Sequence, residues 1–307
     1  MAELRNTFSW SHSRRGVFET CLRRYFLVYY GSWGGWEATA PPAVREAWIQ
    51  KRLTTLPMWI GTLVHEAAEE ALKALCHGRP VVPDTLLARS RARAAHQVQE
   101  SASGAALRAS GKATVFQEHY YREPIPDGAW DAAIEEVGRQ IRTFLADPVY
   151  LRLCQVPDRL MEVESLEQVD VEGVPVWVKL DALVSDGRGG CVIVDWKTGA
   201  AHDSDAIGEQ LGVYGLYCQI HHGIPPSDLV AMHVNLRYGT RAQHRVDDQT
   251  LEATRRTIAT SACAMRSLLE DPSRNVASRE RFPMLPLGDP TCRGCPFRRT
   301  CGRETSD

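Results

Sequence analysis

Long hydrophobic runs are missing from the sequence. None of its apolar stretches approaches the roughly 18 residues that a membrane-spanning helix needs, so no contact with a membrane is expected. The arginines near the amino terminus have no apolar stretch behind them, which argues against a secretory signal. Repeats and low-complexity tracts are missing as well. These absences exclude membrane and repeat proteins and favour a globular protein.

A strong excess of one charge sign is also missing. The 36 Lys and Arg residues against 38 Asp and Glu residues give a net charge of −2, which excludes a uniformly basic nucleic-acid coat but not a local basic track. Hydrophobic residues make up 44% of the 307 positions, which argues against disorder and suffices for a buried core. No clean linker divides the chain. We therefore predict one domain over residues 1–307, with a helical insertion at about 78–128.

The nine cysteines are unevenly placed and do not predict a disulfide framework. Their number is odd and no secretory signal precedes them, so a reducing, cytoplasmic location is expected. Five of them lie among apolar neighbours and are interpreted as ordinary buried thiols. These five are Cys76, Cys154, Cys191, Cys218 and Cys263.

The hydrophobic pattern changes along the chain from helical to alternating and back. It predicts a mixed α/β protein in which a small sheet is flanked by helices. Residues 31–58 are rich in Gly, Pro and Trp and predict an irregular connection. Helices are predicted over 11–30, 60–76, 84–110, 129–147, 205–222 and 249–270, and strands over 160–169, 174–185, 191–197, 228–237 and 242–246.

Two predicted strands flank a hairpin turn at residues 186–190. With Arg188 at the apex, symmetric antiparallel pairing joins residues whose numbers sum to 376, which sets Asp181 opposite Asp195 with Cβ atoms about 5 Å apart. Two opposed carboxylates are unfavourable unless a charge neutralises them, and carboxylate oxygens favour Mg²⁺ or Mn²⁺. Lys197 shares a face with Asp195 because it follows two residues later. A solvated hairpin face with unrelated charges explains the same residues.

Two further segments place polar side chains on helices. The segment from Gly61 to His65 opens a predicted helix, and a lone histidine there is ordinarily a capping or surface residue. Gln210, Tyr214 and Tyr217 fall on one face of a later helix by their spacing. Taken alone, the tyrosines are explained by core packing.

The order of these motifs resembles a known family. The chain carries Gly-x-x-x-His, then Glu164 on a strand, then an Asp on a strand, then Asp-x-Lys and finally Gln-x-x-x-Tyr. This order resembles the PD-(D/E)XK nuclease superfamily, and in particular its RecB-like branch. The resemblance spans residues 61–217, and the stretch 195–199 (Asp-Trp-Lys-Thr-Gly) is its most specific part. The sequence departs from the family at Val178, where RecB-like proteins often have Gly.

The resemblance implies an α/β fold with a restriction-endonuclease-like core, in which a small mixed sheet is flanked by helices. It also implies roles for particular residues. It implies that Asp181, Asp195, His65 and the main-chain carbonyl of Trp196 hold Mg²⁺ or Mn²⁺. Such a cation polarises the scissile phosphate and lowers the pKa of a bound water.

The same resemblance implies the catalytic and substrate-binding groups. Lys197 positions the attacking water or offsets the charge of the transition state, beside the catalytic Asp181 and Asp195. Glu164 orients a metal-bound water. Gln210 and Tyr214 contact the substrate backbone or brace Lys197.

Four cysteines remain: Cys21 and a C-x₂-C-x₅-C pattern at Cys292, Cys295 and Cys301. Zinc is the first interpretation of a C-x₂-C, with His12 or another histidine as a further ligand. One distant cysteine before this pattern resembles the 4Fe–4S site of iron–sulfur RecB-like nucleases, which include CRISPR-associated exonucleases and the AddB nuclease domain. The resemblance implies a structural 4Fe–4S cluster that joins the two ends of the chain.

Basic residues concentrate near these cysteines. Residues 1–30 carry a balance of +3 and residues 274–303 a balance of +5, which makes a phosphate track if the two segments meet. Trp33 and Trp36 could stack on bases, although packing under a loop is the favoured interpretation.

The predicted function is a metal-dependent deoxyribonuclease. The resemblance implies exonuclease action on single-stranded DNA ends, in DNA repair, recombination or phage defence. No G-x-x-x-x-G-K-[ST] motif is present, so unwinding would need a helicase partner. The alternative is a non-catalytic nucleic-acid-binding subunit with an iron–sulfur cluster.

Overall fold

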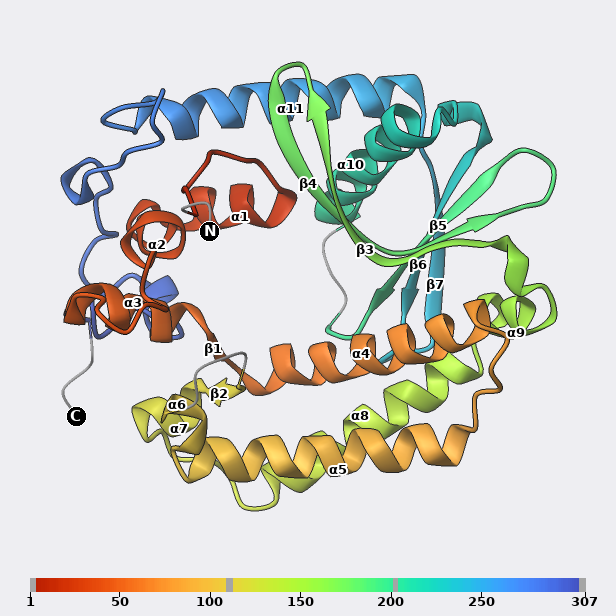
Figure 1. Ribbon diagram of the computed structural model, residues 1–307, viewed down its shortest axis with the longest axis horizontal. Coiled ribbons are helices and arrows are strands. Elements are labelled where there is room, and N and C mark those ends of the chain that lie inside the picture. Colours follow the sequence, from red (N-terminus) through yellow and green to blue (C-terminus); the bar gives the residue numbers. More distant parts are fainter. Residues whose placement is uncertain (1–3, 109–112, 201–203, 304–307) are drawn as a thin grey trace.

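Figure 1 shows the protein as a computed structural model that describes residues 4–108, 113–200 and 204–303. Its centre is a five-stranded sheet in which the strands follow one another in chain order. The third and fourth of these strands pair in parallel, and the other neighbouring pairs are antiparallel. The strands are β3 (Leu160–Val171), β4 (Val174–Ser185), β5 (Cys191–Lys197), β6 (Leu229–Asn235) and β7 (Thr240–Arg245), and a separate parallel pair joins β1 (Leu53–Thr54) to β2 (Val115–Phe116).

Helices cover both faces of the central sheet, and short helices of the amino-terminal segment lie beside the carboxyl-terminal segment (Figure 1). In chain order the helical segments are α1 (His12–Thr20), α2 (Leu22–Phe26), the π-helical η1 (Leu27–Gly31), α3 (Pro42–Lys51), α4 (Leu56–Cys76), α5 (Pro83–Ala102), α6 (Ala105–Arg108), α7 (Gln117–Tyr121), α8 (Ala129–Leu145), α9 (Pro148–Gln155), η2 (Pro157–Arg159), α10 (Ser204–His222), η3 (Pro226–Asp228), α11 (Asp248–Ser267), η4 (Arg279–Arg281) and η5 (Pro290–Cys292).

One face of the sheet shares a buried cluster with α4, α8 and α9, and α5 joins this cluster by packing on α4 and α8. Pro57 lies in the first turn of α4, where its missing N–H costs nothing, and the apolar stripe of this helix points to the sheet. Leu63 and Val64 of α4 join Phe144 of α8 and Trp196 of β5 in one buried cluster. This packing fixes α4 across the end of the sheet where the candidate site lies.

The other face packs on α10 and α11. The contact between these helices is close because α10 carries glycines where it crosses α11. A Cβ atom at Gly215 would lie 2.5 Å from Val246 Cγ1 and 2.9 Å from Leu251 Cδ2, so only Gly permits this approach. Tyr217 and Leu216 of α10 then bury their side chains against the sheet.

The described segments near the two ends of the chain, which carry α1 and α2 and the residues after α11, lie side by side (Figure 1). Arg23 Nε donates to the Phe282 carbonyl at 2.7 Å, and the Tyr25 ring stacks on Phe282 with ring centroids 6.0 Å apart. Asn275 Nδ2 donates to the Asn6 carbonyl at 3.0 Å. The segments that carry the terminal cysteines are therefore in contact.

The predicted α/β class and the flanked mixed sheet are confirmed. The predicted strands match β3 to β7, and the predicted hairpin register is confirmed, because the pairs from Ala182–Val194 to Ser185–Cys191 all sum to 376. We propose that residues 1–307 form one domain, because each of the two large core clusters contains residues of the central sheet. Residues 78–128 supply α5, α6, β2 and α7, of which α5 packs on α4 and α8.

Two differences from the prediction concern the segments before residue 58. The predicted helix over 11–30 is broken at Cys21, which has an extended backbone with φ −164° and caps α2 through its sulfur. Residues 31–58, predicted to be irregular, contain α3, which begins at Pro42. Proline fixes a helical φ and needs no donor at this position, so it starts the helix instead of breaking it.

The five scattered cysteines were predicted to be buried, and two of them are. Cys191 and Cys218 are buried as predicted, but Cys76, Cys154 and Cys263 are exposed, because their helices present those positions to solvent. None of the helices in the described part of the chain has both the length and the apolar character needed to span a membrane.

Candidate active site

The predicted acidic pair lies where β4 and β5 separate. Pairing of these strands ends at Ala182–Val194, one position short of Asp181 and Asp195. Asp181 Oδ2 instead accepts a hydrogen bond from the Trp196 main-chain N–H at 2.8 Å. The two carboxylates are therefore neighbours across the point of separation but do not form a pair of the ladder. They are 8% and 1% exposed, respectively, so their charges are largely removed from water.

Three side chains from three elements converge beside this point. His65 of α4 places Nδ1 3.1 Å from Glu164 Oε1 of β3 and 3.5 Å from Asp181 Oδ1 of β4. Each residue offers one ligand atom, and the three atoms lie within 4.8 Å of one another. The structure thus groups Glu164, for which the resemblance implied a water-orienting role, with His65 and Asp181 more tightly than it groups Asp195.

Glu164 reaches this position through an unusual backbone conformation. Its φ is +48°, in the left-handed region that residues other than Gly rarely occupy, and the β3–β4 pairing skips this residue. Alternation along a strand would place Glu162 and Glu164 on one face. Instead, Glu164 contacts His65 of α4 and Glu162 contacts Tyr217 of α10. Backbone strain of this kind is concentrated at functional sites, which makes Glu164 a candidate functional residue.

Lys197 extends from the end of β5 into a chain of hydrogen bonds. Its Nζ donates to Asp195 Oδ1 and to Gln210 Oε1, both at 2.9 Å, and Gln210 Nε2 donates to the Tyr214 hydroxyl at 2.5 Å. The predicted helix face with Gln210 and Tyr214 therefore meets the predicted Asp-x-Lys strand. Burial, followed by the charges of Asp195 and Asp181, raises the pKa of Tyr214 well above its usual value, so the hydroxyl stays protonated and can donate.

The ionisation of the converging groups is coupled. Burial is the largest influence on His65 and opposes its charge, but the carboxylates of Asp181 and Glu164 outweigh it and raise the pKa of His65 to about 9. Burial, partly offset by His65, raises the pKa of Asp181 to about 7. For Glu164, hydrogen bonds from His65 and Lys179 overcome burial and lower the pKa. Without a cation, the imidazolium takes part of the neutralising role.

These residues fit a divalent cation. Two carboxylates and an imidazole converge, and the raised pKa of the buried Asp181 reports a charge that the protein itself does not fully compensate. A carboxylate-rich set with one nitrogen suits Mg²⁺ or Mn²⁺. For Trp196 the structure shows its N–H bound to Asp181, and the role of its carbonyl as a ligand stays a prediction.

The glycine of the Gly-x-x-x-His motif has a packing reason. A Cβ atom at Gly61 would lie 2.8 Å from Thr198 Oγ1, in the loop that follows Lys197. Gln140 Nε2 of α8 donates to the Thr198 carbonyl at 3.1 Å and holds this loop from the other side. The absence of a side chain at Gly61 lets α4 approach the loop and brings His65, one turn later, to the carboxylates.

Sequence reasoning missed two residues of the site. Lys179 Nζ pairs with Glu164 Oε2 at 2.5 Å, and its position two residues before Asp181 on one strand could have revealed it. His233 Nδ1 lies 3.6 Å from Asp195 Oδ2 because β6 pairs in parallel with β5 and sets these residues side by side. That pairing joins strands separated by α10 and leaves no local sign in the sequence.

The four terminal cysteines line one small cavity. Cys21 reaches it from the break between α1 and α2, while Cys292, Cys295 and Cys301 come from the carboxyl-terminal segment. All four are partly buried free thiols. Burial, with the neighbouring thiols, raises the pKa of Cys301 to about 11. The predicted meeting of Cys21 with the C-x₂-C-x₅-C pattern is therefore present in the fold.

Arginines surround this cavity, but several are committed to internal contacts. Arg23, Arg24, Arg298 and Arg303 line it. Arg298, however, is only 8% exposed and pairs with Glu123. The basic segments do meet as predicted, although only part of their charge is free to face a nucleic acid.

Trp33 and Trp36, for which packing under a loop was the favoured interpretation, are only partly covered. Trp33 and Trp36 contact each other edge to face at 5.1 Å but remain 40% exposed each. Packing therefore covers them only in part, and a face of the pair is open to solvent.

Comparison with known proteins gives the family. The sequence matches the PD-(D/E)XK nuclease superfamily over residues 9–302, so the chain belongs to this superfamily. This confirms the predicted superfamily, and it indicates a metal-dependent nuclease with nucleic acid as its substrate. No curated protein matches the sequence. Among solved structures, one titled "Crystal structure of SSO0001" is similar with 16% identity and a TM-score of 0.29, covering 81% of this chain and 98% of that chain.

Proposed function

We propose that the protein is a deoxyribonuclease that degrades single-stranded DNA from its ends and belongs to the RecB-like iron–sulfur branch of the superfamily. The observation that carries the proposal is the convergence of His65, Glu164 and Asp181, with the Lys197–Asp195 pair beside them. An imidazole, buried carboxylates and a lysine held at 2.9 Å form a set that can bind a cation and a phosphate together.

In this proposal, the cation is Mg²⁺ or Mn²⁺ held by Asp181, Glu164 and His65, with Asp195 and the Trp196 carbonyl completing the set. When bound, such an ion polarises the phosphate and lowers the pKa of a water. As a ligand, Glu164 has less freedom for the water-orienting role that the resemblance implies.

Lys197 supplies the protein's own positive charge at the reaction centre. Its Nζ is positioned between Asp195 and Gln210, so its donors have fixed directions before substrate arrives. A preoriented cation stabilises the charge that develops on the phosphate oxygens without further reorganisation. Gln210 and Tyr214 hold Lys197 and offer amide and hydroxyl groups to the DNA backbone.

We propose a 4Fe–4S cluster at Cys21, Cys292, Cys295 and Cys301. The common cavity of the four cysteines supports it, and the structural role follows from the long loop that ligation would close. Anaerobically purified protein should be brown and contain about four iron atoms per chain. Stoichiometric zinc without iron would instead support the zinc interpretation.

The proposed preference for single-stranded DNA rests on the resemblance, and the exposed Trp33–Trp36 pair supports it. The exposed part of the Trp33–Trp36 pair offers a flat apolar platform of the kind on which bases stack. We propose that a separate helicase supplies unwound ends during DNA repair, recombination or phage defence. A cysteine-ligated cluster agrees with a reducing, cytoplasmic location.

The test is degradation of a single strand labelled at either end, alongside a circular single strand, with Mg²⁺, Mn²⁺ or a chelator. The proposal expects metal-dependent loss of the linear strand from one end and an intact circle. Cleavage of the circle would replace the exonuclease with an endonuclease. Tight binding without degradation under any metal would support the non-catalytic subunit.

A further inference from the structure

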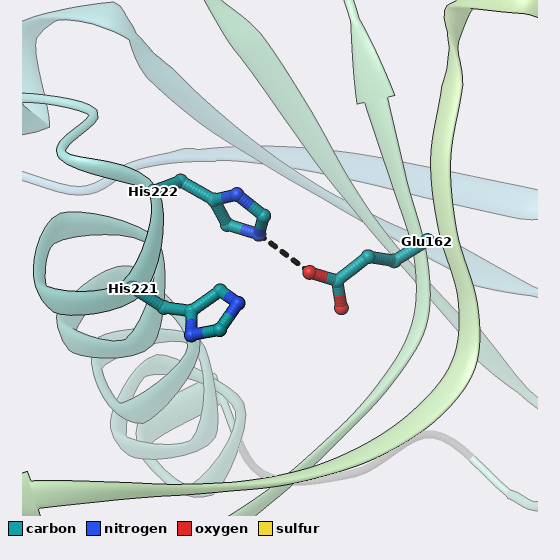
Figure 2. Close-up of side chains that lie close together, drawn as sticks. All are labelled: Glu162, His221 and His222. Carbon is teal, nitrogen blue, oxygen red and sulfur yellow. Dashed lines mark hydrogen bonds and ion pairs between the residues drawn. The ribbon is translucent and has the colours of Figure 1, made fainter.

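A second group of metal-binding side chains lies apart from the active site. Glu162 of β3 meets His221 and His222 at the carboxyl-terminal end of α10, and Figure 2 shows both imidazoles turned toward the Glu162 carboxylate. One ligand atom from each residue lies within 4.8 Å of the others. Sequence reasoning singled out none of the three.

This group is not an extension of the site around Asp181. Glu162 and Glu164 are only two residues apart, but the left-handed backbone at Glu164 turns the two carboxylates to different helices. Glu164 contacts His65 of α4, whereas Glu162 contacts His222 of α10. A ligand at one group would therefore leave the side chains of the other in place.

The side chains of the second group are held in position by their neighbours. The Tyr217 hydroxyl donates to Glu162 Oε1 at 2.7 Å, and His222 Nε2 lies 2.5 Å from the same oxygen. The Tyr217 ring stacks on His221 with centroids 5.1 Å apart and planes 12° apart. The rings and the carboxylate are thus oriented toward one another before any ligand binds.

One acceptor in the group has no partner among the residues that the structure describes. Glu162 Oε2 is buried and accepts no hydrogen bond from the described residues. A buried carboxylate oxygen left without a donor is costly, so a buried cation or an ordered donor is the expected complement. The group also lies at the negative end of the α10 dipole, which favours positive charge.

We propose that Glu162, His221 and His222 form a binding site for a zinc-class divalent ion. Two imidazoles and one carboxylate are a donor set that suits zinc, with a fourth position open to water. His221 is exposed and gives the ion access from solvent. Because the ligands come from β3 and α10, a bound ion would tie the edge of the sheet to the helix that carries Gln210.

The test is a Zn²⁺ titration of the whole protein, purified anaerobically, with excess Mg²⁺ present to occupy the carboxylate site. Wild type is compared with Glu162→Gln, which keeps an acceptor for Tyr217, and with the exposed substitution His221→Ala. His96→Ala is the matched control, because His96 is an exposed histidine of α5 that pairs with Glu100, one turn later on the same helix. Zinc bound by thiols is common to all four proteins and is subtracted.

Wild type and His96→Ala should bind one more equivalent of Zn²⁺ than the two ligand variants, or bind it at least about tenfold more tightly. Co²⁺ added in place of Zn²⁺ should give a visible absorption band that both ligand variants lose. Equal stoichiometry and affinity in all four proteins, with unchanged thermal unfolding, would overturn the proposal and leave the group as a hydrogen-bond network around Tyr217.

Discussion

Replacing Lys197 with Met tests the polar network at the end of β5. The change keeps most of the side-chain volume but removes the charge that lies 2.9 Å from Asp195 and from Gln210 Oε1. Asp195 is 1% exposed, so its charge would lose its lysine partner in a nearly dry environment. Breaking a fully buried pair costs about 3–5 kcal/mol. Because the Lys197 side chain is 20% exposed, we expect a loss of about 2–3 kcal/mol in the free energy of unfolding.

The catalytic effect of the same variant should be separate and larger. Removing one preoriented donor from a reaction centre typically lowers the rate by about 10²–10³-fold. Single-turnover degradation of an end-labelled strand in Mg²⁺ measures this rate, and urea unfolding measures the stability. Lys73→Met is the control, because the Lys73 side chain forms an exposed pair with Glu69, and its loss should change neither quantity appreciably.

A double-mutant cycle with Asp195→Asn identifies the source of the stability loss. If the lysine acts through the aspartate, the combined variant should be more stable than the sum of the single effects predicts, by about 0.5–3 kcal/mol. Degradation by Lys197→Met within about twofold of wild type would refute the role of this lysine in catalysis. Strict additivity in the cycle would refute its pairing with Asp195.

Three further changes test other parts of the structure. Burial opposes the charge of His65, but the facing carboxylates outweigh it and raise the pKa of His65 to about 9. Because a metal ligand must be neutral, Mn²⁺ affinity should rise from pH 7 to 9, and calorimetry should detect proton release on binding. The stability that the charged imidazole gives the metal-free fold is present below about pH 6.5 and is lost as the pH rises through about 9. Gly215→Ala should lower the free energy of unfolding by about 1–3 kcal/mol because its Cβ would lie 2.5 Å from Val246 Cγ1, whereas Gly208→Ala on the same helix, with nothing within 4 Å, should not. Trp33→Ala should weaken single-strand binding by about 1–3 kcal/mol in a fluorescence titration, and unchanged binding would exclude base stacking there.

The hairpin was predictable because its information is local. Alternating strands flank a turn with glycines at Gly187 and Gly189, and both adopt positive φ. A symmetric loop then sets the register, which the pairs from Ala182 to Ser185 confirm. The predicted pair of Asp181 with Asp195 is not part of the ladder, because the Asp181 side chain accepts a hydrogen bond from the Trp196 N–H where the ladder would have continued.

The rest of the site depends on contacts between distant segments. The convergence of His65 with Glu164 requires α4 to cross β3, and the family resemblance, not a local pattern, placed these residues together. The left-handed Glu164 has no sequence signature, because strain of this kind is sustained by the surrounding fold. Likewise, the break at Cys21 has no Gly or Pro to signal it, and it lies where α2 contacts the distant Phe282 through Arg23.

Binding of Mn²⁺, followed by electron paramagnetic resonance, tests the central claim most directly. Wild type should bind one Mn²⁺ at the carboxylate site, and Asp181→Asn should lose that ion while keeping the fold by circular dichroism. His221→Ala lies in the second group and should retain it. Equal Mn²⁺ binding by wild type and Asp181→Asn would contradict the assignment of the cation to His65, Glu164 and Asp181.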